Sequence, residues 1–263
     1  MQKYWIYFKI EVQRFLQYRS DLIFFTLSGI ILPLVLMALW VSVTKYSSNL
    51  PFSYNEIILY FLLVLWVEQV NSTWGAYFIQ QEINDGKFSN YLLRPFPLAG
   101  NYFVQNISEK IYKLFLSTTV AISLAFILLK PISLDLNPVS TILFLFSTVL
   151  TFIIAFYIDL IFGISTLWFH QNDFIKNFFQ SIEALMSGKI VPLALFPAVF
   201  APFILYSPFR YILSFPIEII LNKLSVFDLI LGFSLQLFWL IVIKLFFDWL
   251  YQKGIKIYQA YGS

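Results

Sequence analysis

Long apolar segments separated by short polar ones run through the whole chain. Residues 22–44 and 136–158 are two such segments, and neither contains a charged residue or a histidine. A helix needs about 20 apolar residues to cross the hydrocarbon of a bilayer, so both segments are long enough. Strands of a transmembrane barrel would instead show about 10 residues of alternating polarity. The pattern therefore predicts an all-α integral membrane protein.

We expect six transmembrane helices, over residues 22–43, 56–78, 105–129, 139–168, 177–192 and 227–250. Residues 193–224, before the last of them, are apolar but contain four prolines. Proline removes a backbone donor and breaks a straight helix. Non-helical backbone survives at membrane depth only where protein or a cavity covers it. We therefore expect one or two short re-entrant helices in residues 193–224.

The first residues, 3–20, alternate aromatic and basic side chains. Their apolar positions fall on one helical face, formed by Trp5, Phe8, Val12, Phe15 and Leu16. A basic helix with an aromatic face lies in the plane of the membrane interface, so an interfacial elbow helix is expected here. The alternative is a solvated lead-in to the first span.

Composition supports a single membrane domain over residues 1–263. The chain is 60% hydrophobic and 12% charged, whereas soluble domains are about 45–50% apolar and about 25% charged. It has no cysteine, which excludes disulfides and thiolate metal sites. Its one histidine, His170, cannot build a metal site alone, so no metal is expected. The net charge of +3 is too dispersed to indicate nucleic-acid binding.

The lysines and arginines predict the orientation of the chain. Cytoplasmic segments of membrane proteins are enriched in these residues. With six spans and a cytoplasmic N-terminus, twelve of the 17 lysines and arginines lie on the inner side. We therefore expect a multi-pass protein of the bacterial cell (inner) membrane with both termini in the cytoplasm.

The polar stretch at residues 82–97 faces the cytoplasm in this topology. Proline disfavours helix in the residue before it, so a helix of two or three turns ending before Pro95 is expected. Such a segment lies at the membrane surface with one apolar side available to a separate protein. The residues predicted to make that contact are Glu82, Asp85, Gly86, Lys87, Tyr91, Leu92, Leu93, Arg94 and Pro95.

Three carboxylates, those of Glu68, Asp159 and Glu183, fall within predicted spans. Acids at membrane depth are candidates for a direct role in transport. The alternative is that each pairs with a polar neighbour inside the bundle. A proton-coupled carrier would usually combine such acids with broken helices in both halves of the chain, and here one proline-rich region occurs.

The sequence predicts no catalytic residue and no cofactor site. An ATP-binding loop would read GxxxxGK[ST]. The two Gly-Lys pairs, at Gly86 and Gly188, lack both the earlier glycine and the following serine or threonine. If ATP drives this protein, a partner chain binds the ATP and its magnesium.

Residues 82–88 (EINDGKF) and 92–95 (LLRP) together resemble the cytoplasmic loop of ABC-2 type exporter permeases. Residues 187–216, with their Ser-Gly, Val-Pro and Phe-Pro pairs, are similar to the region before the last span in the six-span branch of that family. That branch works with a separately encoded ATPase. Arg210 departs from the pattern, because it places a cation in a usually apolar run.

The resemblance implies the permease subunit of an ATP-driven exporter. It implies two ATPase subunits and a second permease, either an identical copy or a paralogue, with the substrate path between the two permeases. Residues 82–97 would form the coupling helix seated on the ATPase. Two alternatives remain, an ion-coupled carrier acting alone and a membrane scaffold that transports nothing. The apolar, aromatic-rich composition favours amphipathic or hydrophobic cargo.

Overall fold

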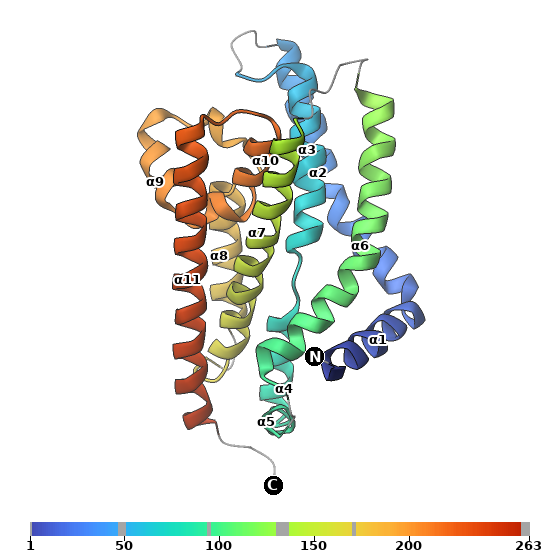
Figure 1. The fold of residues 1–263 in the computed structure, drawn as a ribbon, viewed down its shortest axis with the longest axis vertical. Helices are drawn as coiled ribbons and strands as arrows, with labels where there is room; N and C mark the ends of the chain where they lie inside the picture. The colour runs from blue at the N-terminus through green and yellow to red at the C-terminus, as the bar shows by residue number, and fades with distance from the viewer. Residues whose placement is uncertain (1, 47–50, 94–95, 130–136, 170–171, 259–263) are drawn as a thin grey trace.

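The computed structural model describes residues 2–46, 51–93, 96–129, 137–169 and 172–258, which are helices joined by turns and short irregular segments (Figure 1). The longer helices are α1 (Gln2–Gln17), α2 (Arg19–Tyr46), α3 (Tyr54–Asn71), α4 (Gly75–Asn84), α6 (Leu98–Leu128), α7 (Pro138–Ser165), α8 (Asp173–Met186) and α11 (Val226–Ile257). The short ones are α5 (Ser89–Leu92), η1 (Leu193–Leu195), η2 (Ala198–Phe200), α9 (Ala201–Tyr206), η3 (Phe209–Ile212) and α10 (Ser214–Ile220). The predicted all-α fold is confirmed.

Five helical stretches among the described residues are long and apolar enough to cross a membrane. They are Ser20–Tyr46, Tyr54–Asn84, Leu98–Leu128, Pro138–Ser165 and Val226–Ile257. They cover the predicted spans except the one at residues 177–192. There the structure has α8, whose 14 residues reach only about 21 Å. α8 ends at Met186 because Gly188 takes a positive φ of 88° and Pro192 follows.

Three helix boundaries differ from the prediction. The span predicted over residues 56–78 is two helices, because Ser72, Thr73 and Trp74 interrupt it. The helix predicted from residue 105 begins at Leu98, directly after Pro97, which suits a helix start. Residues 193–224 hold five short helical segments rather than one or two, and a proline stands at the N-cap or in the first turn of each of them, where proline suits a helix start.

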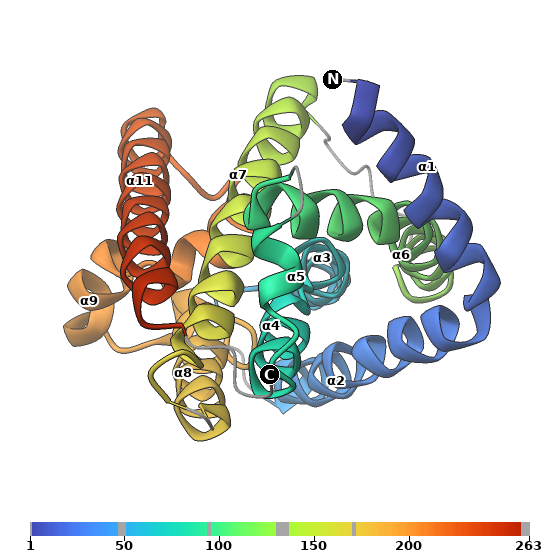
Figure 2. The same ribbon diagram turned by 90° about the horizontal axis from the view of Figure 1, so that it is seen from below.

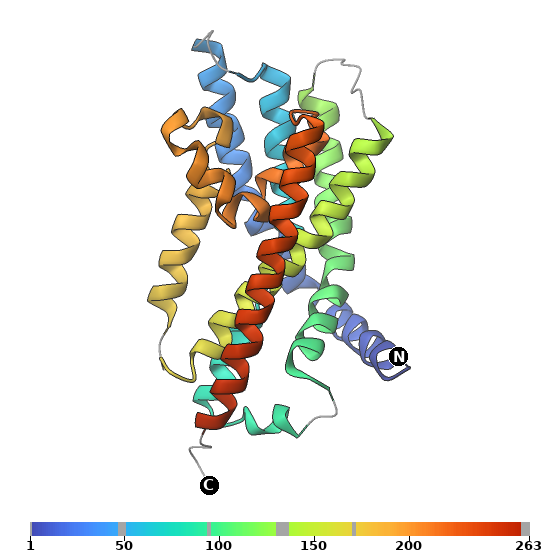
Figure 3. The ribbon, with the colours of Figure 1, turned by 60° about the vertical axis from the view of Figure 1, so that its left-hand side comes forward.

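The two ends of the bundle carry different kinds of structure. At the lower end in Figures 1 and 3 lie α4, α5 and the end of α11. At the upper end lie α9, α10 and the C-terminal ends of α2 and α6. We call residues 85–93 the α4–α5 loop and residues 187–221 the proline-rich segment.

α3 is the centre of the bundle, and α2, α6 and α7 surround it in Figure 2. Ten of its 18 residues are buried, among them Ile57, Val64 and Val67. The outer helices instead expose large apolar side chains such as Phe24, Phe115 and Phe126. Exposed apolar surface of this extent matches a lipid environment rather than water.

α1 lies across the bundle rather than along it (Figure 2). It packs on α6, where Gln105 donates a hydrogen bond of 2.5 Å to the Tyr7 hydroxyl. Burial raises the pKa of Tyr7. The opposite face of α1 exposes Trp5 and Ile6 beside Lys9. The basic, aromatic helix expected at residues 3–20 is therefore present over residues 2–17, with its apolar and basic side facing outward.

Candidate functional site: a polar cavity and the α4–α5 loop

A cavity of about 520 Å³ lies among α2, α3, α6, α7 and α8. All three carboxylates predicted from the sequence, Glu68, Asp159 and Glu183, line it. Three lysines share the lining: Lys113, Lys176 and Lys189. Charged groups at membrane depth usually mark a functional path or a structural pair, so the partners of each acid decide between these roles.

The break between α3 and α4 forms one wall of the cavity. Lys110 of α6 donates hydrogen bonds to the Ser72 carbonyl and, at 3.0 Å, to the Ser72 hydroxyl. Lys113 donates to the same hydroxyl at 3.1 Å and pairs with Glu109 at 2.7 Å. A carbonyl freed at the C-terminal end of a helix favours a cation. The two lysines therefore stabilise the interruption of the helix.

Asp159 caps the N-terminus of α4, on the other side of the break between α3 and α4. Its carboxylate accepts a hydrogen bond of 3.0 Å from the Ala76 backbone N–H, in the first turn of α4. A carboxylate at a helix N-terminus satisfies a free donor and the helix dipole together. Lys176 of α8 lies 3.5 Å from the other carboxylate oxygen. Asp159 therefore has two partners that hold α4 and α8 to α7, which supports the structural role over direct transport.

Glu68 and Glu183 differ from Asp159 and from each other. Glu68 of α3 forms an ion pair of 2.5 Å with Lys189, just after α8. Glu183 of α8 lines the cavity six residues before that lysine. Within the described residues, no hydrogen bond or ion pair reaches its carboxylate. The three predicted acids thus line one cavity, but they differ in their hydrogen bonds and ion pairs.

α8 turns a polar face toward the cavity. Lys176, Phe179, Gln180, Glu183 and Ala184 line it, at the three- and four-residue spacing of one helical face. The opposite face exposes apolar side chains, of which Phe174 (82%) and Phe178 (61%) are the most exposed. α8 is therefore an amphipathic helix whose more polar side lines the cavity.

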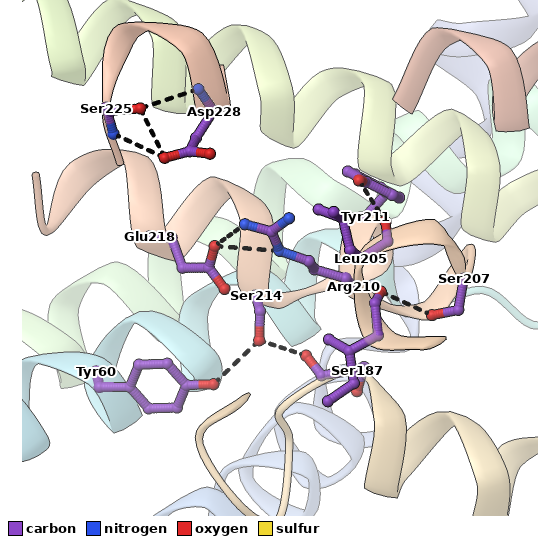
Figure 4. A network of polar contacts seen from close by, with 11 residues as sticks. Tyr60, Ser187, Leu205, Ser207, Arg210, Tyr211, Ser214, Glu218, Ser225 and Asp228 are labelled. Atoms are coloured by element: carbon purple, nitrogen blue, oxygen red, sulfur yellow. Dashed lines mark hydrogen bonds and ion pairs between the residues drawn. The ribbon is translucent and has the colours of Figure 1, made fainter. Parts of the chain in front are cut away.

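The proline-rich segment closes against the upper part of α3 through a buried hydrogen-bond network (Figure 4). The Tyr60 hydroxyl donates 2.7 Å to the Gly188 carbonyl and lies 3.2 Å from the Ser214 hydroxyl. Ser214 in turn donates 2.6 Å to the Ser187 carbonyl. The positive φ of Gly188 makes this close approach possible, because a Cβ there would lie 2.0 Å from the Ser214 hydroxyl oxygen.

Side chains of α2, α3 and α11 donate to further backbone carbonyls of the same irregular region. Trp40 of α2 donates to Ile190 at 2.8 Å, Asn71 of α3 to Ile212 at 2.6 Å, and Trp239 of α11 to Tyr206 at 3.0 Å. Backbone that leaves the helix at membrane depth needs such partners.

Arg210, the departure noted in the sequence, has a partner within the chain. Its guanidinium forms two hydrogen bonds to one carboxylate oxygen of Glu218, at 2.5 and 3.2 Å (Figure 4). Glu218 lies on α10, eight residues further along. The cation in the usually apolar run is therefore a structural ion pair between η3 and α10.

The α4–α5 loop is a tight turn fastened to the end of α11. Gly86 has a positive φ of 70°, as its turn position requires. The Tyr258 hydroxyl donates to the Gly86 carbonyl at 3.1 Å and accepts from the Ser89 backbone N–H at 3.2 Å. Phe88 is fully buried against the Tyr258 ring. α5 has only four residues, so the expected helix of two or three turns is a single turn.

Of the residues predicted to contact a separate protein, some pack inside this protein and others are exposed at its surface. Tyr91 stacks on Tyr102, whose hydroxyl donates to Glu82 at 3.4 Å. Leu93 is 84% exposed, and Lys87 and Asp85 form an exposed ion pair of 3.1 Å. Arg94, Pro95 and the Leu92 side chain lie outside the described residues. Of the described apolar side chains at this loop, Leu93 is the one that faces outward.

Sequence reasoning missed the lysines that organise the cavity. Lys110 and Lys113 are buried between about three and four turns into α6. Their spacing of three residues on one helical face was the available signal. For Lys189 the available signal was its place beside an apolar segment, where a lysine needs a carboxylate partner.

Comparison with known proteins supports a transporter. A family model described as "ABC-2 family transporter protein" matches residues 21–262. No curated protein matches the sequence. The matched residues include the cavity, the α4–α5 loop and the proline-rich segment. This chain, a helical membrane protein with several spans, therefore belongs to the ABC-2 family of transporter proteins.

Proposed function

We propose that this chain is the permease subunit of an ATP-driven exporter, working as a pair of permeases with two separate ATPase subunits. The family match over residues 21–262 carries the proposal. The pair consists of two copies or of this chain and a paralogue. ATP and magnesium belong to the ATPase subunits, and this chain supplies the membrane path.

The α4–α5 loop is proposed to receive the movement of the ATPase. Leu93 offers an exposed apolar contact at the end of the bundle, and the charged pair of Asp85 and Lys87 beside it can set the orientation of a partner. α4 leads from this loop directly to the helix break at the cavity. Asp159, which caps α4, also lines the cavity. A shift of the loop therefore acts on the cavity wall through one short helix.

Affinity purification of the tagged full-length protein from its own cells tests the proposal. We expect an ATPase with nucleotide-binding motifs to co-purify, and Arg94→Glu to weaken that association or its ATPase stimulation. An ion-coupled carrier or a scaffold requires no such partner. Stable export activity by the purified chain without any ATPase would contradict the proposal.

The proposed orientation places the α4–α5 loop and both termini in the cytoplasm of a bacterial inner membrane. The chain has no cysteine, so single cysteines can report the side directly. Lys87→Cys should react only with a membrane-permeant thiol reagent in intact cells. Tyr46→Cys, at the opposite end on a residue 92% exposed, should react with an impermeant one. The reverse pattern would overturn this orientation.

A further inference from the structure

Glu183 lines the cavity, but the ion pairs formed by the described lysines of the cavity do not include its carboxylate. Glu68 and Glu183 face the same part of the cavity, where Lys189 supplies the positive charge. Lys189 is engaged with Glu68 at 2.5 Å. In the ranges that the structure describes, no side chain or backbone donor contacts the Glu183 carboxylate. This corner therefore carries one negative charge more than its lysine neutralises.

The remaining charges of the lining are matched by neighbours. Asp159 has Lys176 and the N-terminus of α4 as partners. Lys113 has Glu109 at 2.7 Å. These groups have no need of an outside ion. Glu183 is half-buried, and a carboxylate at membrane depth without a partner is costly, so the excess charge at Glu183 favours a ligand with positive charge.

The rest of the cavity wall fits an apolar ligand body. Phe25, Phe162 and Phe179 line it together with Leu32 and Ile158. The rings of Phe162 and Phe179 lie 5.2 Å apart on two different helices. Aromatic faces attract cations as well as apolar groups. The volume of about 520 Å³ is within the range of about 300–1,000 Å³ typical of small-molecule sites.

We propose that the cavity binds a hydrophobic organic cation, with its positive group at Glu183 beside the Glu68–Lys189 pair and its apolar body against Phe25, Phe162 and Phe179. The inference rests on the proposed function, because it names the substrate class of the exporter. It also narrows the expectation from composition, an amphipathic or hydrophobic cargo, to one that carries a positive charge.

Binding of tetraphenylphosphonium to the full-length protein in lipid nanodiscs tests the site without the ATPase. Tetraphenylborate, an anion of nearly the same shape, is the matched probe, and empty nanodiscs correct for partition into lipid. We expect Glu183→Gln to weaken phosphonium binding roughly tenfold, the scale of losing one charge pair at a partly buried site. The borate should bind weakly to the unmodified protein.

Two further variants test the sign of the charge. Lys189→Gln frees the Glu68 carboxylate, so we expect phosphonium to bind several-fold more tightly. Glu68→Gln frees Lys189 to neutralise Glu183, so we expect binding to weaken. Asp248→Asn removes a carboxylate on α11 that pairs with Lys244 outside the cavity, and it should leave binding unchanged. Size-exclusion profiles identify any variant that fails to fold.

Equal binding of phosphonium and borate would overturn the proposal, as would full phosphonium affinity in Glu183→Gln. Weaker binding in Lys189→Gln would also overturn it, because the site would then require the ion pair rather than the spare carboxylate. The assay contains no ATPase, so these outcomes are independent of co-purification. A failed site with a bound ATPase would leave the exporter function standing.

Discussion

Irregular backbone occurs at both ends of this protein, and the two ends satisfy it differently. In the proline-rich segment, side chains of α2, α3 and α11 reach the freed carbonyls at 2.6–3.0 Å. At the α4–α5 loop, Tyr258 supplies the bridging hydroxyl, and the charged side chains of Asp85 and Lys87 face outward. Backbone surrounded by lipid needs protein partners, whereas backbone at the surface can use water. The first end is therefore built for rigidity and the second is available to a partner.

Gly188→Ala should have the largest effect on stability. The new Cβ would lie 2.0 Å from the Ser214 hydroxyl and 2.6 Å from the Tyr60 hydroxyl, on a backbone with φ of 88°. Overpacking and left-handed strain together should cost at least about 3 kcal/mol of unfolding free energy. Gly86→Ala at the other end also faces a positive φ and should cost about 1 kcal/mol. Thermal unfolding in detergent measures both.

A rescue variant separates crowding from other causes. Ser214→Ala removes the atom nearest to the new Cβ, so the double mutant with Gly188→Ala should recover part of the lost stability. No recovery, or equal losses at Gly188 and Gly86, would contradict the difference between the two ends.

Tyr60→Phe should have the next largest effect. It removes the donor to the Gly188 carbonyl at 2.7 Å from a residue that is 2% exposed. An acceptor left without its partner in the interior costs about 1–3 kcal/mol. The same thermal unfolding assay applies, with Tyr46→Phe as the control, because Tyr46 is 92% exposed. Unchanged stability of Tyr60→Phe would show that the network does not hold the segment.

The spans were predictable because length and hydropathy decide them. Length and hydropathy do not decide the break between α3 and α4 or the short helices of the proline-rich segment, and these were predicted less well. The break at Ser72 depends on Lys110 and Asp159, which lie 38 and 87 residues further along the chain and stabilise its two sides. A window of local sequence contains neither partner. The residues from Asn71 to Thr73 are polar, but only the fold shows where the charges meet.

The three acids show the same limit at the level of the site. The expected membrane depth singled out Glu68, Asp159 and Glu183, and the structure brings all three to one cavity. Depth alone could not distinguish a helix cap from an ion pair or an unpaired carboxylate, because Lys176 and Lys189 decide that. At the α4–α5 loop, Tyr91 looked available for docking, yet it stacks on Tyr102 from the next helix.

Tyr258→Phe should have a smaller effect on stability than Tyr60→Phe. Its hydroxyl bridges Gly86 and Ser89, but the site is half-buried and water can replace the lost bonds. We expect a loss of about 0.5–1.5 kcal/mol. A larger loss than for Tyr60→Phe would mean that the loop end is the more rigid of the two.

Leu93→Asp should have the smallest effect on stability and yet the clearest effect on function. Leu93 is 84% exposed, and substitutions at such positions usually change the unfolding free energy by less than about 0.5 kcal/mol. A carboxylate buried in an apolar contact with the ATPase would be costly, so stimulation of ATP hydrolysis by the permease should fall at least about tenfold. Leu93→Met, which keeps the apolar surface, is the matched control. If Leu93→Asp assembles and stimulates the ATPase normally, the outward-facing side chain at this end is not the contact, and the proposed coupling through α4 loses its support.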